Sequence, residues 1–187
     1  HAERATAMGF CLFGSVAIAA RHAAERRGLS RIAVVDFDVH HGNGTQDLLW
    51  DERRTLFISS HQMPLYPGTG HPRETGAHQN VMNVPLAPMT GGAEMKKAWE
   101  REAFPALEDF APELVIVSAG FDAHAEDPLA NLNWVEDDFV WLTRAIREVA
   151  DAHAGGRVVS TLEGGYDLKA LGASVAAHTR VLMEAGG

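Results

Sequence analysis

Four short apolar runs, separated by stretches of helical length, constrain the fold of this chain more than any other feature. They are rich in β-branched residues and cover residues 31–37, 55–60, 113–119 and 157–162. Runs of this length and composition are typical of strands that are buried on both faces. Strands that alternate with helices favour a parallel sheet between two helical layers. The sequence therefore predicts an α/β fold with three layers, α/β/α, and a mainly parallel sheet.

The stretches before, between and after the runs predict four helices and one long loop. Ser15 is expected to cap the first helix and Gly28 to stop it, and the second helix is expected to end before Pro112. A loop rich in Pro and Gly is expected over residues 63–76. The expected helices cover residues 15–27, 93–110, 136–153 and 167–185.

Composition limits the compartment and the partners. The chain has 187 residues, enough for one domain with a core, and no apolar run near the roughly 20 residues of a membrane span. Its single cysteine, Cys11, excludes an intramolecular disulfide and is expected to be a small buried residue rather than a nucleophile. A reducing, cytoplasmic location is the simplest expectation.

The formal net charge of −9 bears on partners. A broad nucleic-acid surface needs a basic footprint, so direct nucleic-acid binding is not expected. An acidic surface would favour cationic partners such as Lys-rich peptides or polyamines. A negative balance also simply keeps a protein soluble, and this plainer explanation is favoured because charge alone rarely identifies a partner.

Acidic and imidazole side chains follow the predicted strands at one edge of the sheet, where ligands of parallel sheets bind. Residues 36–44 read DFDVHHGNG, and side-chain alternation starts Asp36, Asp38 and His40 on one side of the chain. Asp38 and His40 can reach a single cation, and Asp122 follows the third run. Two carboxylates and one imidazole supply three protein ligands, the number that a catalytic zinc keeps.

Two further residues complete a hydrolytic centre. Gly164 and Gly165 permit a tight turn that aims Tyr166 back at the edge, where a phenol can donate to a developing oxyanion. His1 is a candidate general base. Taken singly, each residue has a plainer explanation: a strand-end DxD as a turn, Asp122 as a cap, Tyr166 as a core aromatic, His1 as a solvated terminus. The prediction rests on their convergence at one edge.

The chain carries a dense and ordered series of short motifs: HAE (1–3), GFCLF (9–13), DVHHGNGTQ (38–46), YPGTG (66–70), VSAGFDAH (117–124), DPL (127–129) and LEGGYDL (162–168). In this combination the sequence resembles the histone deacetylase family, including bacterial deacetylase-like amidohydrolases. The resemblance covers nearly the whole chain and implies an arginase/deacetylase-like fold. Residues 1–187 would then be a single, partial catalytic domain whose N-terminal part is missing.

The resemblance implies a mononuclear zinc site with Asp38, His40 and Asp122 as ligands. Fe²⁺ can replace Zn²⁺, because two carboxylates and an imidazole do not select strongly. It further implies that Tyr166 polarises the acetyl carbonyl. His1 matches the second of two tandem active-site histidines and would be the general base, while the first would immediately precede this chain.

The same resemblance assigns supporting residues. Asp36 would orient the first tandem histidine, and Asn43 would contact His1. A structural K⁺ would be bound by Asp36, by the backbone of Asp38 and His40, and by Ser59.

The implied substrate pocket is a tunnel for the stem of an acyl-lysine. Gly9, Phe10 and Tyr66 would line it, and Tyr66 stands where the family usually has Phe, so its hydroxyl can alter acyl-chain preference. Leu129 stands where polyamine-selective relatives can carry an acidic gatekeeper, and leucine favours acyl-lysine in peptides. The expected activity is therefore zinc-dependent removal of acetyl or other acyl groups from lysine side chains of proteins.

Three alternatives remain open at this stage. An acetylpolyamine amidohydrolase would use the same chemistry on another acetylated amine. A binuclear manganese hydrolase of the arginase type would need a second set of bridging ligands, for which His124 and Asp127 are the nearby candidates. A truncated remnant that binds metal or acyl-lysine would not be an enzyme. Without the segment before His1, residues 1–187 are expected to expose a sheet edge and apolar surface.

Overall fold

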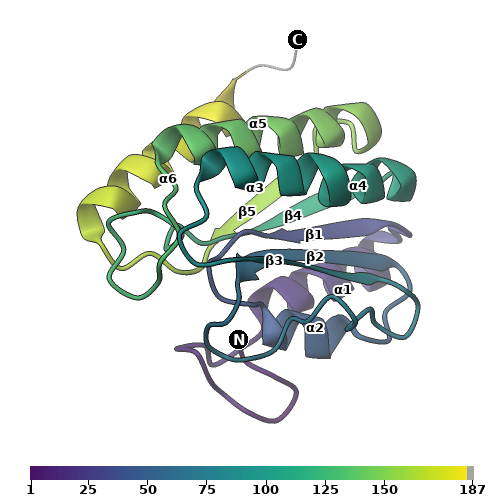
Figure 1. Ribbon diagram of the computed structural model, residues 1–187. Coiled ribbons are helices and arrows are strands. Elements are labelled where there is room, and N and C mark those ends of the chain that lie inside the picture. Colours follow the sequence, from purple (N-terminus) through teal and green to yellow (C-terminus); the bar gives the residue numbers. More distant parts are fainter. Residues whose placement is uncertain (185–187) are drawn as a thin grey trace.

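The four apolar runs form four strands of a five-stranded parallel sheet in a computed structural model that describes residues 1–184 (Figure 1). The order is β3-β2-β1-β4-β5, and every neighbouring pair is parallel. The predicted α/β/α fold is confirmed. The strands are β1 Ile32–Asp36, β2 Thr55–Gln62, β3 Val81–Leu86, β4 Leu114–Ala119 and β5 Val158–Leu162.

Helices cover the two faces of the sheet unequally. One face carries α1 Ser15–Arg27 and α2 Asn43–Leu49, whose apolar residues pack against Val34 and Phe57. The other face carries α3 Gly92–Ala98, η1 Trp99–Ala103, α4 Phe104–Phe110, α5 Glu136–His153 and α6 Leu168–Met183. This second layer encloses the larger core, in which Phe37, Trp99 and Phe139 are fully buried. No helix of residues 1–184 is both long enough and apolar enough to cross a membrane.

The register of the strands brings their carboxyl ends to one level. Asp36, the last residue of β1, pairs with Ser59 of β2 and with Ser118 of β4. Ala119, the last residue of β4, pairs with Leu162 at the end of β5. The loops that follow β1, β4 and β5 therefore leave the sheet side by side, as parallel topology requires.

Two elements escaped prediction. Strand β3 contains Asn83 and Pro85, which normally argue against a strand, but Pro85 is tolerated because β3 lies at the edge of the sheet. Helix α2 is a short segment containing Gly44, with no side-chain cap. Its stability comes from packing rather than from propensity, since Leu49 is fully buried.

Two predicted helix boundaries need correction. Ser15 does not cap α1, because the N-cap is Gly14 and Ser15 is the first helical residue, whereas Gly28 stops the helix in the left-handed conformation as predicted. Asp167 caps α6 rather than beginning it. The predicted end of that helix at residue 185 lies outside the described residues.

The predicted helix 93–110 is divided by a π-helical turn. Proline has no backbone N–H to bond to the preceding turn, and Pro105 lies at the start of α4. Immediately before it, the N–H of Phe104 bonds to the carbonyl of Trp99, five residues earlier, which is the π-helical spacing. The missing donor of Pro105 explains why the ladder widens at this point.

Strand β5 contradicts the expectation that helices cover the sheet on both faces. Val159 and Leu162 are 52% and 56% exposed, respectively. Leu12 and Phe13 of the N-terminal segment are also exposed, and they line one cavity together with Leu162. Residues 1–184 therefore present an apolar surface beside an edge strand, as the sequence predicts. Cys11 is partly exposed rather than buried, so the expectation for this residue was wrong.

His178 on α6 gives the fold a dependence on pH. It is 4% exposed, and its Nδ1 and Nε2 lie 2.7 Å from Thr143 Oγ1 and 2.8 Å from Ser160 Oγ. Burial lowers its pKa from 6.5 to about 4. Below about pH 6.5 the unfolded chain binds a proton at this histidine, whereas the folded chain binds it only near pH 4. The neutral histidine therefore stabilises the fold fully above about pH 6.5. We expect that contribution, on the order of 2 kcal/mol, to be lost as the pH falls toward 4.

Urea unfolding of the wild type and of His178→Gln between neutral and mildly acidic pH tests this expectation. The variant should show the shallower fall in unfolding free energy, because glutamine does not titrate. His22→Gln, an exposed histidine on α1, should behave like the wild type. Equal pH slopes for wild type and His178→Gln would contradict the assignment.

Candidate functional site

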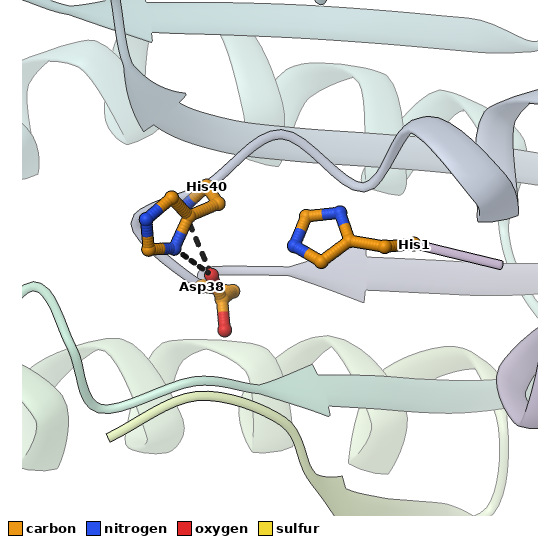
Figure 2. Close-up of side chains that lie close together, drawn as sticks. All are labelled: His1, Asp38 and His40. Carbon is orange, nitrogen blue, oxygen red and sulfur yellow. Dashed lines mark hydrogen bonds and ion pairs between the residues drawn. The ribbon is translucent and has the colours of Figure 1, made fainter. Parts of the chain in front are cut away.

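The candidate site lies where the carboxyl ends of β1, β4 and β5 meet. Asp38 and His40 follow β1, Asp122 follows β4, and Tyr166 follows β5. His1, from the N-terminal segment, closes the opposite side (Figure 2). Four segments far apart in the sequence thus bring all five predicted chemical groups together.

The two aspartates converge on one nitrogen of His40. His40 Nδ1 lies 3.0 Å from Asp122 Oδ2 and 3.2 Å from Asp38 Oδ1. Backbone N–H groups fix both carboxylates, with Val39 donating to Asp122 Oδ1 at 2.9 Å and Gly164 donating to Asp38 Oδ2 at 2.7 Å. The three side chains are therefore held with their ligand atoms facing a common point.

The turn after β5 needs glycine at position 164, because its backbone lies against the carboxylates of Asp38 and Asp122. A Cβ at this position would overlap Asp122 Oδ2 and lie 2.6 Å from Asp38 Oδ2. The backbone of the LEGGYD turn thus rests directly on the two carboxylates, which places Tyr166 beside them.

The electrostatics of this cluster suit a bound cation. Asp122 is fully buried and Asp38 nearly so. Burial and the charge of Asp38 raise the pKa of Asp122 to about 7. Burial opposes protonation of His40, but its hydrogen bonds to Asp122 and Asp38 prevail and raise its pKa to about 10. Two buried carboxylates are costly without a positive partner, and an imidazole aimed between them completes a donor set for a divalent metal.

His1 faces this cluster from the open side. One ligand atom each of His1, Asp38 and His40 lies within 4.8 Å of the other two (Figure 2). His1 Nδ1 is 2.7 Å from Asn43 Oδ1, and the Asn43 amide nitrogen donates to Glu3 Oε1 at 2.7 Å. Because a carboxylate only accepts, Glu3 fixes the orientation of the Asn43 amide. Asn43 then holds the proton of His1 on Nδ1 and leaves Nε2 free to accept.

Asp36 lies behind the cluster and does not contact His1. It is 3% exposed, and its Oδ1 accepts a hydrogen bond from the N–H of Asp38 at 3.0 Å. Burial, then Asp38 and Glu163, raise the pKa of Asp36 well above its usual range. Ser59, its partner across the strands, is fully buried. A buried carboxylate beside a buried hydroxyl is a suitable place for a small cation.

Two cavities meet at this cluster, and both are bounded by His1, Gly9, His40 and Tyr166. The first, which we call the outer cavity, has a volume of about 460 Å³ and is mainly apolar, with Phe10, Leu65, Tyr66 and Leu129 completing its wall. The second, which we call the inner cavity because it includes the buried Asp36, Asp38 and Ser118, has a volume of about 340 Å³ and also opens to solvent beside Leu162. The four predicted pocket residues, Gly9, Phe10, Tyr66 and Leu129, therefore share one pocket that ends at the predicted ligands.

Tyr166 stands at the junction of the two cavities. Burial, then the charges of Asp122, Asp38 and Asp127, raise the pKa of its phenol, so the hydroxyl keeps its proton. Asp127 accepts the N–H of Tyr166 at 2.8 Å with Oδ2 and the N–H of Leu129 at 3.0 Å with Oδ1. This carboxylate ties the phenol loop to the pocket wall.

Sequence reasoning missed several residues around the site. Glu163 accepts a hydrogen bond from Ser118 Oγ at 3.0 Å, and burial raises its pKa. Its place directly before Gly164 in the predicted turn was the available signal. His41 and His61 were also missed; burial lowers the pKa of both, that of His41 to about 4, so both rings are neutral.

Comparison with known proteins identifies relatives along almost the whole chain. The family model described as "Histone deacetylase domain" matches residues 1–182. "Histone deacetylase 10, chloroplastic" of Oryza sativa subsp. japonica is 44% identical over 98% of this chain and 42% of its own length. "Histone deacetylase-like amidohydrolase" of Pseudomonas aeruginosa is 44% identical over 86% of this chain and 43% of its own length.

A solved structure agrees with the sequence comparison. The crystal structure of the HDA15 HD domain superimposes with a TM-score of 0.91 and 36% identity, covering 97% of this chain and 52% of that chain. The chain thus spans about half the length of these relatives.

Proposed function

This chain belongs to the histone deacetylase family, and from that premise we propose that the protein is a zinc-dependent amidohydrolase. It would remove acetyl or other acyl groups from lysine side chains of proteins or peptides, with residues 1–187 as part of its catalytic domain. One observation carries the proposal: Asp38 and Asp122 meet at His40 Nδ1, where an apolar pocket ends between Tyr166 and His1.

We assign the metal to Asp38, His40 and Asp122. The structure also allows a set in which His1 replaces Asp122, since His1 lies near the other two. Asp122 is preferred because it is fully buried against His40 Nδ1, whereas His1 is partly exposed and bonded to Asn43. A bound Zn²⁺, or Fe²⁺ in its place, would polarise the acyl carbonyl and lower the pKa of a water molecule.

The protein's own groups supply the remaining chemistry. His1 presents Nε2 toward the metal cluster, so it can take a proton from the attacking water and return one to the leaving amine. Tyr166 keeps its hydroxyl proton and can donate it to the developing oxyanion. Asp36 and Ser59, with the backbone of Asp38 and His40, would hold a structural K⁺ behind the metal ligands.

A mononuclear centre fits better than a binuclear one. Both carboxylate oxygens of Asp127 already accept backbone N–H groups, and His124 Nδ1 accepts the N–H of Glu126. His124 Nε2 lies 3.6 Å from Glu136 Oε2, and neither His124 nor Asp127 belongs to the group of His1, Asp38 and His40 whose ligand atoms converge within residues 1–184. A zinc stoichiometry of one for the full natural protein that contains residues 1–187, together with hydrolysis of an acetyl-lysine peptide, tests the proposal. Failure of hydrolysis with metal bound would favour a binding remnant.

Acetylated lysine is favoured over acetylpolyamine because Leu129 closes the pocket without charge. We expect Leu129→Glu to raise kcat/KM for N-acetylspermidine, relative to an acetyl-lysine peptide, by about 10-fold. The new carboxylate would face the secondary ammonium of the polyamine, which a peptide lacks. Side-by-side steady-state rates on the two substrates measure the effect.

Leu129→Gln is the matched control, since it has the length of glutamate and no charge. It should leave the substrate ratio close to that of the wild type. If the wild type already prefers acetylspermidine, the assignment to acyl-lysine is wrong while the hydrolytic chemistry stands.

An intracellular location is part of the proposal. The names of the Oryza sativa relative and of "Histone deacetylase 14, chloroplastic" of Arabidopsis thaliana place those two proteins in chloroplasts. Localisation of a tagged natural protein tests the compartment.

A further inference from the structure

Two buried imidazoles, His41 and His61, lie under the loop that carries Tyr66 and take no part in the proposed reaction. Each is 1% exposed, and their ring centroids are 4.8 Å apart. They come from different elements, His61 from β2 and His41 from the turn before α2. Neutral histidines buried as a pair need a specific set of hydrogen bonds, and that set identifies what they hold.

The bonds of His61 define its tautomer. Nε2 lies 3.0 Å from the carbonyl oxygen of Gly70, which only accepts, so Nε2 carries the proton. Nδ1 is then an acceptor, and it accepts a hydrogen bond from the hydroxyl of Ser59, whose Oγ lies 3.0 Å away. His61 thus connects the centre of the sheet to the backbone of the loop.

His41 likewise uses one ring nitrogen as a donor and the other as an acceptor. Its Nε2 lies 3.0 Å from Gln46 Oε1, while Gln46 Nε2 donates to Glu74 Oε2. The proton of His41 is therefore on Nε2, and Nδ1 accepts from Thr69 Oγ1 at 2.8 Å. Glu74 completes the arrangement by accepting the N–H groups of Gly70 at 3.1 Å and His71 at 3.0 Å.

Gly70 shows how tightly the loop is held. Its φ is +92°, in the region that favours glycine, and a Cβ would overlap His61 Nε2 and lie 2.7 Å from His41 Cγ. We call His41, His61, Gln46 and Glu74 the imidazole clamp. Within residues 1–184 this clamp forms hydrogen bonds with three consecutive loop residues, Thr69, Gly70 and His71.

The clamped residues follow Tyr66 closely. The ring of Tyr66 lies 5.5 Å from that of His1 and 6.3 Å from that of His40, measured between centroids. Tyr66 is 48% exposed, so its own packing fixes it only in part. Its distance from the metal cluster therefore depends on where the next few residues of the loop are anchored.

We propose that the imidazole clamp is a positioning device that sets the Tyr66 wall of the pocket at a fixed distance from the metal cluster and so selects the length of the acyl chain. This inference rests on the proposed deacylase function. His41 and His61 are positioning residues in it, because they act through the loop and do not touch the substrate.

The test compares four variants in the zinc-loaded natural protein on lysine peptides with acetyl, butyryl and longer acyl groups. His61→Leu removes the hydrogen bonds of His61 to Ser59 and to Gly70. His61→Gln keeps an N–H for the Gly70 carbonyl. Thr69→Val, at an exposed position, removes the hydroxyl that donates a hydrogen bond to His41. His78→Leu, an exposed histidine in the same loop region, is the matched control.

His61→Leu is expected to lower kcat/KM for the acetyl peptide by about 10-fold, mainly through KM, and to change the ratio between acetyl and longer chains. Thr69→Val should shift the ratio in the same direction, by less. His61→Gln should recover most of the loss, His78→Leu should match the wild type, and zinc content should not change. An equal loss of kcat on every acyl chain, or an unchanged acyl-length profile in both His61→Leu and Thr69→Val, would overturn the proposal.

Hydrogen exchange of residues 66–71 separates this inference from the proposed function. Exchange should be faster in His61→Leu than in His61→Gln or His78→Leu. Absence of hydrolysis by the unmodified protein would overturn the deacylase function alone. Unchanged exchange in His61→Leu would overturn the clamp whatever the activity.

Discussion

Replacing Tyr166 with phenylalanine is expected to lower kcat by about 10²–10³-fold in the zinc-loaded natural protein, while zinc stays bound. The phenol stands at the junction of the two cavities, and its burial, then the nearby carboxylates, raise its pKa, so it acts as a hydrogen-bond donor at neutral pH. The loss should appear in kcat and kcat/KM alike, because the hydroxyl stabilises charge that develops only in the transition state. Steady-state kinetics with an acetyl-lysine peptide and zinc analysis of the same sample measure both parts.

Tyr66→Phe is the natural comparison, since the chain has two tyrosines. It removes the same atom from the pocket wall, where no developing charge is expected, and should change kcat far less than Tyr166→Phe. Near-wild-type turnover by Tyr166→Phe would exclude the phenol from the reaction.

The second large effect concerns Asp122. Asp122→Asn keeps an oxygen for the Val39 N–H but removes the charge that faces His40 Nδ1. We expect bound zinc to fall far below one per chain, with loss of activity, because a direct ligand matters more than the outer partners whose loss costs roughly 10- to 100-fold in metal affinity. Removing a buried, repelled carboxylate should leave the metal-free fold at least as stable as before.

Elemental analysis after dialysis, compared with a control variant, distinguishes the loss of a zinc ligand from a general disturbance of the fold. Asp127→Asn is the control, a buried aspartate five residues away whose oxygens bind only backbone N–H groups. It should retain zinc even if its rate falls. A full equivalent of zinc in Asp122→Asn would remove Asp122 from the ligand set and favour His1 in its place.

The α/β fold class and the gathering of the candidate site residues at one edge of the sheet could both be predicted from the sequence. Asp38, His40, Asp122 and Tyr166 follow strands directly, and parallel topology forces such positions together. Strand β3 was missed because Pro85 is compatible with a strand only at an edge, and edge position is a property of the finished sheet. Helix α2 was missed because tertiary packing, which no local pattern encodes, supports it.

The supporting residues were the hardest to predict. The family resemblance implied that Asn43 contacts His1, and the two side chains are hydrogen-bonded. The role of Glu3 in orienting the Asn43 amide depends on a contact across 40 residues. The contact of His61 with Gly70 likewise depends on how a long loop folds back over β2. Such contacts have no periodicity, so they become visible only in three dimensions.

The exposed flank of β5 has a consequence for the inner cavity of the candidate site. Leu162 is more than half exposed, yet it also lines the inner cavity together with Asp36 and Glu163. Any polypeptide that shields this leucine from water becomes a wall of that cavity. Covering the hydrophobic surface of β5 and closing the inner cavity are therefore a single structural event, which would couple the stability of the fold to the proposed catalysis at this strand.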